Sequence, residues 1–204
     1  GMKSDATQIE GVCVIDARPG ANIVSGTRVG NGLELFEGIA NNTIEDSFRH
    51  LDVRAGDAFL IPPGAPHSLG DGILAYSITS PLLETSGVYD WGRYGELNID
   101  KALDSFRYDY SISLCARERK DESREVLIES ELFRLERVDA TVPVEEYTDR
   151  YFCAYTALTQ GRIRYTERTR NFAAGDTFLM PAGFGDYTIL DGVLLKAQPE
   201  SNPC

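Results

Sequence analysis

Side chains that could bind a transition metal are scarce in this chain. Histidine occurs only at His50 and His67. The cysteines are Cys13, Cys115, Cys153 and Cys204. No two of them form the C-x-x-C spacing typical of zinc and redox motifs, and two lie within apolar, strand-like runs. We therefore expect reduced thiols and a cytoplasmic protein, in which His67 or His50 would supply any imidazole ligand.

A second group of chemically capable side chains surrounds Arg93. Residues 88–93 read Val-Tyr-Asp-Trp-Gly-Arg, which places Tyr89 and Trp91 close to this arginine in the sequence. A guanidinium can donate two parallel hydrogen bonds to an anion, so Arg93 is a candidate for an anion site. Tyr89 and Trp91 could line a binding site beside it. Core packing for the rings, and a solvated or ion-paired Arg93, are the plainer alternatives.

Strands must position these residues, because most of the sequence consists of short apolar runs broken by Gly, Pro, Asn and Asp. Strands are predicted over residues 12–17, 32–36, 58–61, 73–79, 132–138, 152–158, 162–167, 177–180 and 193–197. Two short helices are predicted, over 44–50 with Thr43 as N-cap and over 99–106 with Asn98 as N-cap. This spacing is typical of a β-sandwich or barrel.

An internal repeat organises the chain. Gly-Asp-Ala-Phe-Leu-Ile-Pro-Pro-Gly at 56–64 matches Gly-Asp-Thr-Phe-Leu-Met-Pro-Ala-Gly at 175–183, and Asp186 stands in the second copy where the first has His67. Gly-Asp predicts a tight turn, the Phe-Leu run a buried strand, and Pro-x-Gly its end. We therefore predict two modules, 2–116 with a helical insertion and 127–204, joined by the charged linker 117–126.

The charge balance argues against large anionic partners. The net charge is −12, from 32 acidic and 20 basic side chains, so nucleic acid and membrane surfaces are disfavoured as partners. The sequence contains no run of 18 apolar residues, which a membrane-spanning helix would need. The N-terminal residues lack the apolar core of a signal peptide. A small anionic substrate would need a local basic site.

The first copy of the repeat fits the second cupin motif, G-x5-P-x-G-x2-H, through Gly56, Pro62, Gly64 and His67. A closer resemblance is to mannose-6-phosphate isomerases of the short bacterial type. It is carried by EGVCVIDARPGA at 10–21, AGDAFLIPPGAPHSLGDGIL at 55–74, and VYDWGR at 88–93 followed by EL and KAL. The resemblance covers most of residues 9–198. It implies an all-β fold of two tandem cupin-type (jelly-roll) β-barrels with one or two short helices.

This resemblance implies aldose–ketose isomerisation of a sugar phosphate through an enediol, at a Zn²⁺ held by Gln, His, Glu and His. Glu10 matches the family's Glu ligand and His67 its final His ligand. Arg93 matches the active-site arginine that meets the negative charge of substrate or intermediate. Tyr89 and Trp91 would then contact the sugar, since carbohydrate faces pack on aromatic rings.

The chain departs from the family pattern at the other two ligands. The family's Gln-x-His pair precedes its Glu, whereas only nine residues precede Glu10 and none is a histidine, so we expect an N-terminally truncated relative. A catalytic zinc usually has three protein ligands. An active isomerase, a non-catalytic bicupin that binds a sugar or sugar phosphate, and a structural scaffold with a vestigial site therefore stay open. For His67 alone, the alternative is a structural histidine hydrogen-bonded in the barrel mouth.

The truncation also predicts a quaternary structure. Without upstream strands, a sheet edge of the first barrel would be unpaired, and such edges are usually covered. We therefore predict a homodimer that covers this edge, with strand exchange near residues 5–15.

Overall fold

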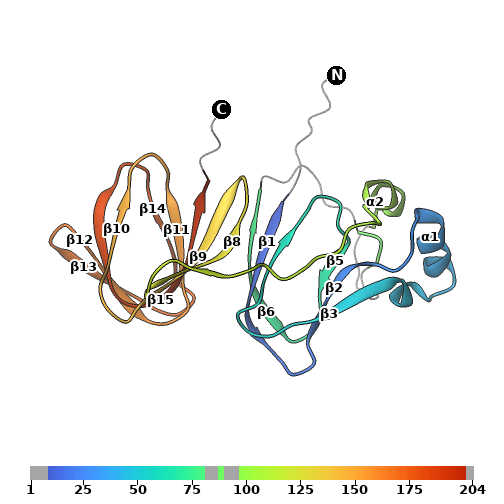
Figure 1. The fold of residues 1–204 in the computed structure, drawn as a ribbon, viewed down its shortest axis with the longest axis horizontal. Coiled ribbons are helices and arrows are strands. Elements are labelled where there is room, and N and C mark those ends of the chain that lie inside the picture. Colours follow the sequence, from blue (N-terminus) through green and yellow to red (C-terminus); the bar gives the residue numbers. More distant parts are fainter. Residues whose placement is uncertain (1–8, 81–86, 90–96, 201–204) are drawn as a thin grey trace, which may run out of the picture. The chain divides into compact units, whose positions relative to one another are not determined.

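A computed structural model describes residues 9–80, 87–89 and 97–200. The chain divides into two compact units, Gly1–Leu114 and Cys115–Cys204, and antiparallel strands build both (Figure 1). The predicted all-β fold with short helices is confirmed, since both α-helices of the described ranges are short and lie in the first unit. No helix in these ranges is long and apolar enough to cross a lipid bilayer.

Two three-stranded sheets form the first unit. Their strand orders are β4–β1–β6 (Ala58–Ile61, Glu10–Ala17, Ile73–Thr79) and β3–β2–β5 (Phe48–Asp52, Asn22–Thr27, His67–Leu69). One apolar core holds Val12 and Phe59 from the first sheet and Ile23 from the second. Because side chains alternate along a strand, every second residue of β1 before its bulge points into this core.

A helix replaces the strand predicted over 32–36. Helix α1 (Gly32–Ala40) begins after Asn31, whose side chain accepts a hydrogen bond from the Glu34 backbone N–H. The apolar residues at 33, 35 and 36 look like a short strand, but this N-cap and the burial of Leu35 favour the helix. Helix α2 (Ile99–Ser105) is confirmed, with Asn98 as its cap. Both helices share an apolar cluster with β2 and β3 (Figure 1).

The helix predicted over 44–50 is wrong in its second half. Only η1 (Ile44–Ser47), one 3₁₀ turn, is helical, and Thr43 makes no side-chain capping bond. From Phe48 onward the chain pairs with β2, and His50 lies opposite Val24. Sheet hydrogen bonds and the burial of Phe48 thus outweigh a weak local helix preference.

Strand β1 is not an edge of its sheet. It pairs with β4 through Glu10↔Ile61 and with β6 through Glu10↔Thr79. Both sides of residues 10–14 are therefore occupied within one chain, so this part of the strand offers no edge for the exchange predicted near residues 5–15. Residues 5–8 lie outside the described part, and the homodimer itself stays a prediction.

The second unit is organised by the long strand β15 (Gly185–Pro199). The first half of β15 pairs with β10 and β12, and its second half pairs with β11 and β9. The other strands of the second unit are β7 (Glu118–Arg119), β8 (Arg124–Glu129), β9 (Phe133–Ala140), β10 (Val144–Thr148), β11 (Cys153–Ala157), β12 (Gly161–Tyr165), β13 (Arg168–Phe172) and β14 (Thr177–Met180). Alternate residues of these strands enclose an apolar core, including Tyr155, Ile189 and Leu194.

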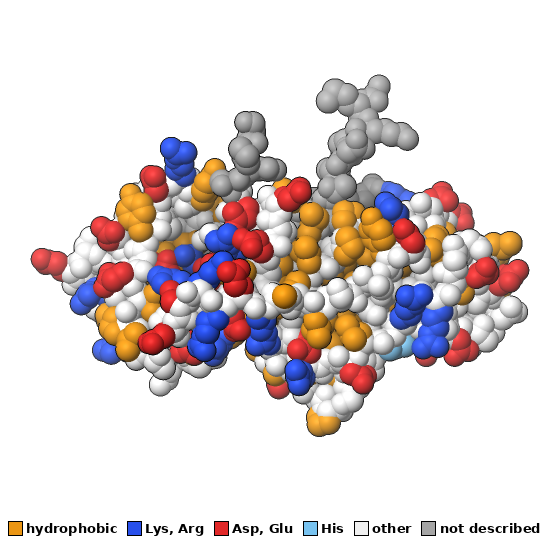
Figure 2. Space-filling model, in the orientation of Figure 1, with side chains coloured by type: hydrophobic (Ala, Val, Ile, Leu, Met, Phe, Trp, Pro, Cys, Tyr) orange, Lys and Arg blue, Asp and Glu red, His pale blue; other side chains and the backbone are white. Residues whose placement is uncertain are grey.

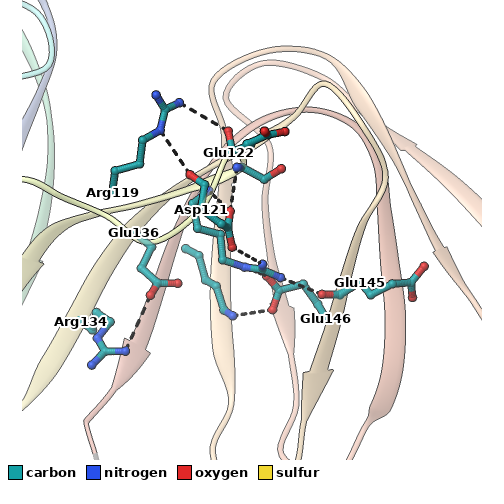
Figure 3. A network of polar contacts seen from close by, with 10 residues as sticks. Arg119, Asp121, Glu122, Arg134, Glu136, Glu145 and Glu146 are labelled. Carbon is teal, nitrogen blue, oxygen red and sulfur yellow. Dashed lines mark hydrogen bonds and ion pairs between the residues drawn. The ribbon is translucent and has the colours of Figure 1, made fainter.

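Residues 117–126, predicted as a linker, form β7 and the start of β8. Charges that look solvated in sequence are paired across this hairpin. Arg119 donates to the carbonyls of Asp121 and Glu122, and Asp121 accepts from Arg124 (Figure 3). Basic and acidic side chains interleave over β8 and β9 (Figure 2). The unit boundary falls earlier, between Leu114 and Cys115.

The internal repeat is visible in the geometry of its turns. Gly56 and Gly175 have φ values of 89° and 90°, in the left-handed region that favours glycine. The carboxylate of Asp57 accepts from the Arg54 backbone N–H at 2.9 Å, and Asp176 accepts from that of Ala173 at 2.8 Å. The Gly-Asp pairs thus close the same turn in both units and start β4 and β14.

Candidate functional site in the first barrel

Glu10 points into the first barrel. On β1 it shares a face with Val12 and Val14, both of which belong to the apolar core. Its side chain is 19% exposed, so the carboxylate lies at one end of the core. A carboxylate in such a place needs polar partners, because removing it from water without them is costly.

His67 meets Glu10 from the opposite sheet. It begins β5 and pairs with Ser25 of β2. Ser25 lies on the same, inward face of β2 as Ile23. The Pro62–Gly64 turn carries the chain from β4, beside Glu10, across to this strand. As a result, the Nε2 atom of His67 lies 3.3 Å from Oε2 of Glu10, although β1 and β5 belong to different sheets.

Ser77 is a third member of the site, which the sequence pattern did not single out. Its hydroxyl donates to Oε1 of Glu10 at 2.5 Å. Ser77 lies opposite Val12 on β6, so it shares the inward face with Glu10. The register of β6 against β1 would have identified it, but register is not readable from local sequence. The bond fixes one carboxylate oxygen and leaves Oε2 directed at His67.

The tautomer of His67 follows from its second contact. Nδ1 lies 2.9 Å from the carbonyl oxygen of Ala65, which can only accept, so Nδ1 carries the proton. In the neutral ring, Nε2 therefore presents a lone pair toward Glu10. Two lone pairs repel at 3.3 Å, so a proton or a cation must lie between them. Such a backbone bond to one ring nitrogen orients the other nitrogen for ligation.

Electrostatics favours the charged pair when no metal is bound. The hydrogen bond with His67 lowers the pKa of Glu10 below its ordinary 4.5, with burial opposing and Ser77 assisting. Burial alone would lower the pKa of His67. The bonds with Glu10 and the Ala65 carbonyl, and the attraction of the carboxylate, outweigh it and raise that pKa above 6.5. Imidazolium and carboxylate thus stabilise each other.

The pair predicts a pH window for stability in the metal-free protein. The contribution of Glu10, whose pKa is lowered, is present above pH 4.5 and is lost as the pH falls through the folded value. The contribution of His67, whose pKa is raised, is present below pH 6.5 and is lost as the pH rises through the folded value. We expect an NMR titration of His67 to have its midpoint above 6.5, and Glu10→Gln to lower it. A His50→Gln variant assigns the resonances, and an unchanged His67 midpoint in Glu10→Gln would contradict the contact.

The two side chains also fit two positions of a zinc coordination shell. Ligand atoms bonded to tetrahedral zinc at about 2.0–2.1 Å lie about 3.3–3.4 Å apart. The Nε2–Oε2 separation of 3.3 Å matches this spacing, and imidazole with carboxylate is a common zinc donor pair. In the described part of the chain, no group of three or more His, Cys, Asp or Glu side chains could hold a metal. The described residues thus supply two ligands.

Comparisons with known proteins point to one enzyme family. No family model matches the sequence. A putative mannose-6-phosphate isomerase of Bacillus subtilis, YvyI, is 26% identical over 186 residues, which are 86% of this chain and 59% of that protein. The mannose-6-phosphate isomerase of Streptococcus mutans is 26% identical over 201 residues, 94% of this chain and 63% of that protein. By sequence, the chain is similar to mannose-6-phosphate isomerases.

Solved structures support the same relationship at the level of fold. The crystal structure of the mannose-6-phosphate isomerase from Bacillus subtilis superposes with a TM-score of 0.84 at 23% identity, covering 94% of this chain and 64% of that one. A putative mannosephosphate isomerase from Archaeoglobus fulgidus gives 0.74 at 17% identity, covering 95% and 61%. The two tandem cupin-type barrels are thereby confirmed. The chain spans 59% of the length of the first curated relative that it matches.

Of the remaining predicted site residues, only Tyr89 lies within the described part of the chain. Arg93 and Trp91 lie outside the described residues. Tyr89 packs on the cluster under the helices, and its hydroxyl donates to Glu45 at 3.0 Å. His50 lies on the other face of its sheet from the core, beside Asn22. Among the histidines, only His67 enters the barrel.

The second barrel carries a different pair at the matching place. Cys153 pairs with Met180 as Glu10 pairs with Ile61, and the hydroxyl of Tyr187 lies 3.3 Å from its sulfur. Tyr187, rather than the exposed Asp186, is therefore the inward counterpart of His67. The second copy has one extra residue after the Pro-x-Gly turn, which shifts the alternation of inward and outward side chains. The sequence alignment therefore matched His67 to Asp186 instead of Tyr187. Burial raises the pKa of Tyr187, so its hydroxyl stays neutral.

Proposed function

We propose that the chain carries the metal-binding half-site of an aldose–ketose isomerase acting on a sugar phosphate of the mannose-6-phosphate type. The observation that carries the proposal is the inward-facing Glu10–His67 contact, at a separation suited to two zinc ligands. The similarity to mannose-6-phosphate isomerases supports the substrate class.

Each residue has a role that follows from its contacts. The Ala65 carbonyl holds the His67 proton on Nδ1 and leaves Nε2 to bind an ion, while Ser77 holds Oε1 of Glu10 and leaves Oε2 for the same ion. The bound ion would polarise the oxygens on the two carbons between which the proton moves. Zinc is a metal that this donor pair suits, and its binding would displace the second proton of His67. Arg93 remains the proposed partner for negative charge, with Tyr89 and Trp91 as proposed sugar contacts.

The experiment is a direct assay of mannose-6-phosphate conversion to fructose-6-phosphate with zinc-supplemented protein. We expect turnover that requires zinc and is removed by a chelator. Turnover no higher than that of a His67→Ala variant at equal zinc would contradict isomerase activity of this chain.

A second candidate is a bicupin that binds a sugar phosphate without turning it over. It is favoured by one observation, that the described residues supply only two ligands whereas catalytic zinc usually has three. Calorimetric titration with mannose-6-phosphate separates the two. Binding heat without turnover supports this candidate, and the absence of both excludes each of them.

A further inference from the structure

We propose that Arg107 anchors the phosphate group of the substrate. The proposal rests on the proposed function for its substrate class, and on the geometry around Arg107 for its site. Arg107 lies in the segment that follows α2, outside every motif considered above. Together with the Ser105 carbonyl, it brings this segment into contact with the turn that precedes His67.

Arg107 lies at the same end of the first barrel as the Glu10–His67 pair. That end is marked by Ile61, opposite Glu10, and by Ala65, whose carbonyl binds His67. Both belong to the barrel core, and Tyr110 packs against this core. The guanidinium of Arg107 covers the ring of Tyr110, with Cζ 4.4 Å from the ring centroid. Because its backbone N–H binds the carbonyl of Gly64, the residue before Ala65, Arg107 lies beside the turn at this end of the barrel.

The position of Arg107 is fixed by the turn that precedes His67. Its backbone N–H donates to the carbonyl of Gly64 at 2.9 Å. Gly64 has a φ of 76°, and a Cβ there would lie 2.8 Å from Cγ of Arg107 and 2.7 Å from the Ser105 carbonyl oxygen. Glycine thus permits the arginine side chain to pack directly on the turn. His67 follows Gly64 by three positions, a reach of about 11 Å at most.

The charge around Arg107 leaves it able to bind an anion. Its side chain is 54% exposed, and Nε lies 3.7 Å from the carboxylate of Asp109, which is 73% exposed. In the described residues, the terminal nitrogens make no hydrogen bond. A guanidinium held on an aromatic face keeps its edge for donation, and two parallel bonds suit phosphate oxygens. On a chain of net charge −12, a phosphorylated substrate needs such a local cation.

A hexose phosphate presents its reacting carbons and its phosphate at opposite ends. The ion-binding pair would meet the first end and Arg107 the second. The segment after α2 is held along this path, because Ile112 donates to the Ser25 carbonyl and Ser25 pairs with His67. Arg107 then determines specificity for phosphorylated over neutral sugars, and it takes no part in proton transfer.

The test compares Arg107→Gln with Arg18→Gln by calorimetry and, where turnover exists, by kinetics. Arg18 is an exposed arginine paired with Asp71 at the far end of β1, so it controls for the loss of one charge. We expect Arg107→Gln to weaken mannose-6-phosphate binding about 10–100-fold while neutral mannose is unaffected. The loss should appear in KM rather than kcat, Arg107→Lys should restore part of it, and inorganic phosphate should compete only with the wild-type site.

The outcomes separate this proposal from the proposed function. Equal mannose-6-phosphate affinity in Arg107→Gln and wild type overturns the anchor, as does a wild type that binds mannose and mannose-6-phosphate alike. An equal loss in Arg18→Gln reduces the effect to overall charge and also overturns it. Phosphate-dependent binding through Arg107 without any isomerisation leaves the anchor standing and removes the isomerase activity.

Discussion

Replacing Lys196 by methionine is expected to destabilise the second unit by about 3 kcal/mol, because it leaves the Glu146 carboxylate buried without its main partner. Nζ of Lys196 lies 2.6 Å from Oε2 of Glu146, and their side chains are 10% and 4% exposed. Lys196 shares the inward face of β15 with Leu194, and Glu146 shares that of β10 with Val144. Arg124 still reaches Oε1 of Glu146, at 3.3 Å, and limits the loss (Figure 3).

Hydrogen exchange resolved to peptides of β10 and β15 measures this change within the second unit. The matched control is the double variant Lys196→Met with Glu146→Gln, which removes both charges and should recover most of the stability. Methionine keeps the length of the side chain, so a cavity contributes little. Protection in the single variant equal to that of wild type would show that Lys196 does not neutralise Glu146.

Under the proposed function, removing either member of the Glu10–His67 pair is expected to lower isomerase turnover by about 100-fold or more. Losing an outer-shell partner of a metal site typically costs about 10–100-fold, and losing a ligand costs at least as much. His67→Ala and Glu10→Gln should also weaken zinc binding measured by competition with a chelating dye. Ser77→Ala, which only frees Oε1 of Glu10, should lower turnover about 10-fold.

The matched control is His50→Ala. His50 is the only other histidine of the chain, and it lies on the opposite face of its sheet, bonded to Asn22. Its removal should change neither turnover nor zinc affinity. Equal losses in His50→Ala and His67→Ala would mean that the histidines act through stability, and full turnover in His67→Ala would remove the pair from the mechanism.

The repeat was the part of the fold most readable from sequence. Gly56-Asp57 and Gly175-Asp176 each combine a left-handed glycine with a side-chain-closed turn, so local chemistry dictates the structure and β4 and β14 follow. The turn also predicted the position of His67. Local chemistry of this kind does not depend on distant residues, which is why it could be read from the sequence.

The errors arose where tertiary contacts decide the structure. The apolar run in α1 has no helical period long enough to distinguish it from a strand, and β3 forms only because β2 is available to pair with it. Ser77 and Tyr187 depend on register, where one residue moves a side chain to the opposite face. Arg107 carries no motif at all, and only the packing of its segment on Gly64 brings it to the barrel end.

We propose above all that Glu10 and His67 together bind one zinc ion inside the first barrel. Crystals grown with zinc, measured on both sides of its absorption edge, test it directly. We expect an anomalous peak about 2.0–2.2 Å from both Nε2 of His67 and Oε2 of Glu10, with the Ala65 carbonyl still bonded to Nδ1. A fully occupied zinc elsewhere in the chain, with an unbridged Glu10–His67 hydrogen bond, would contradict it.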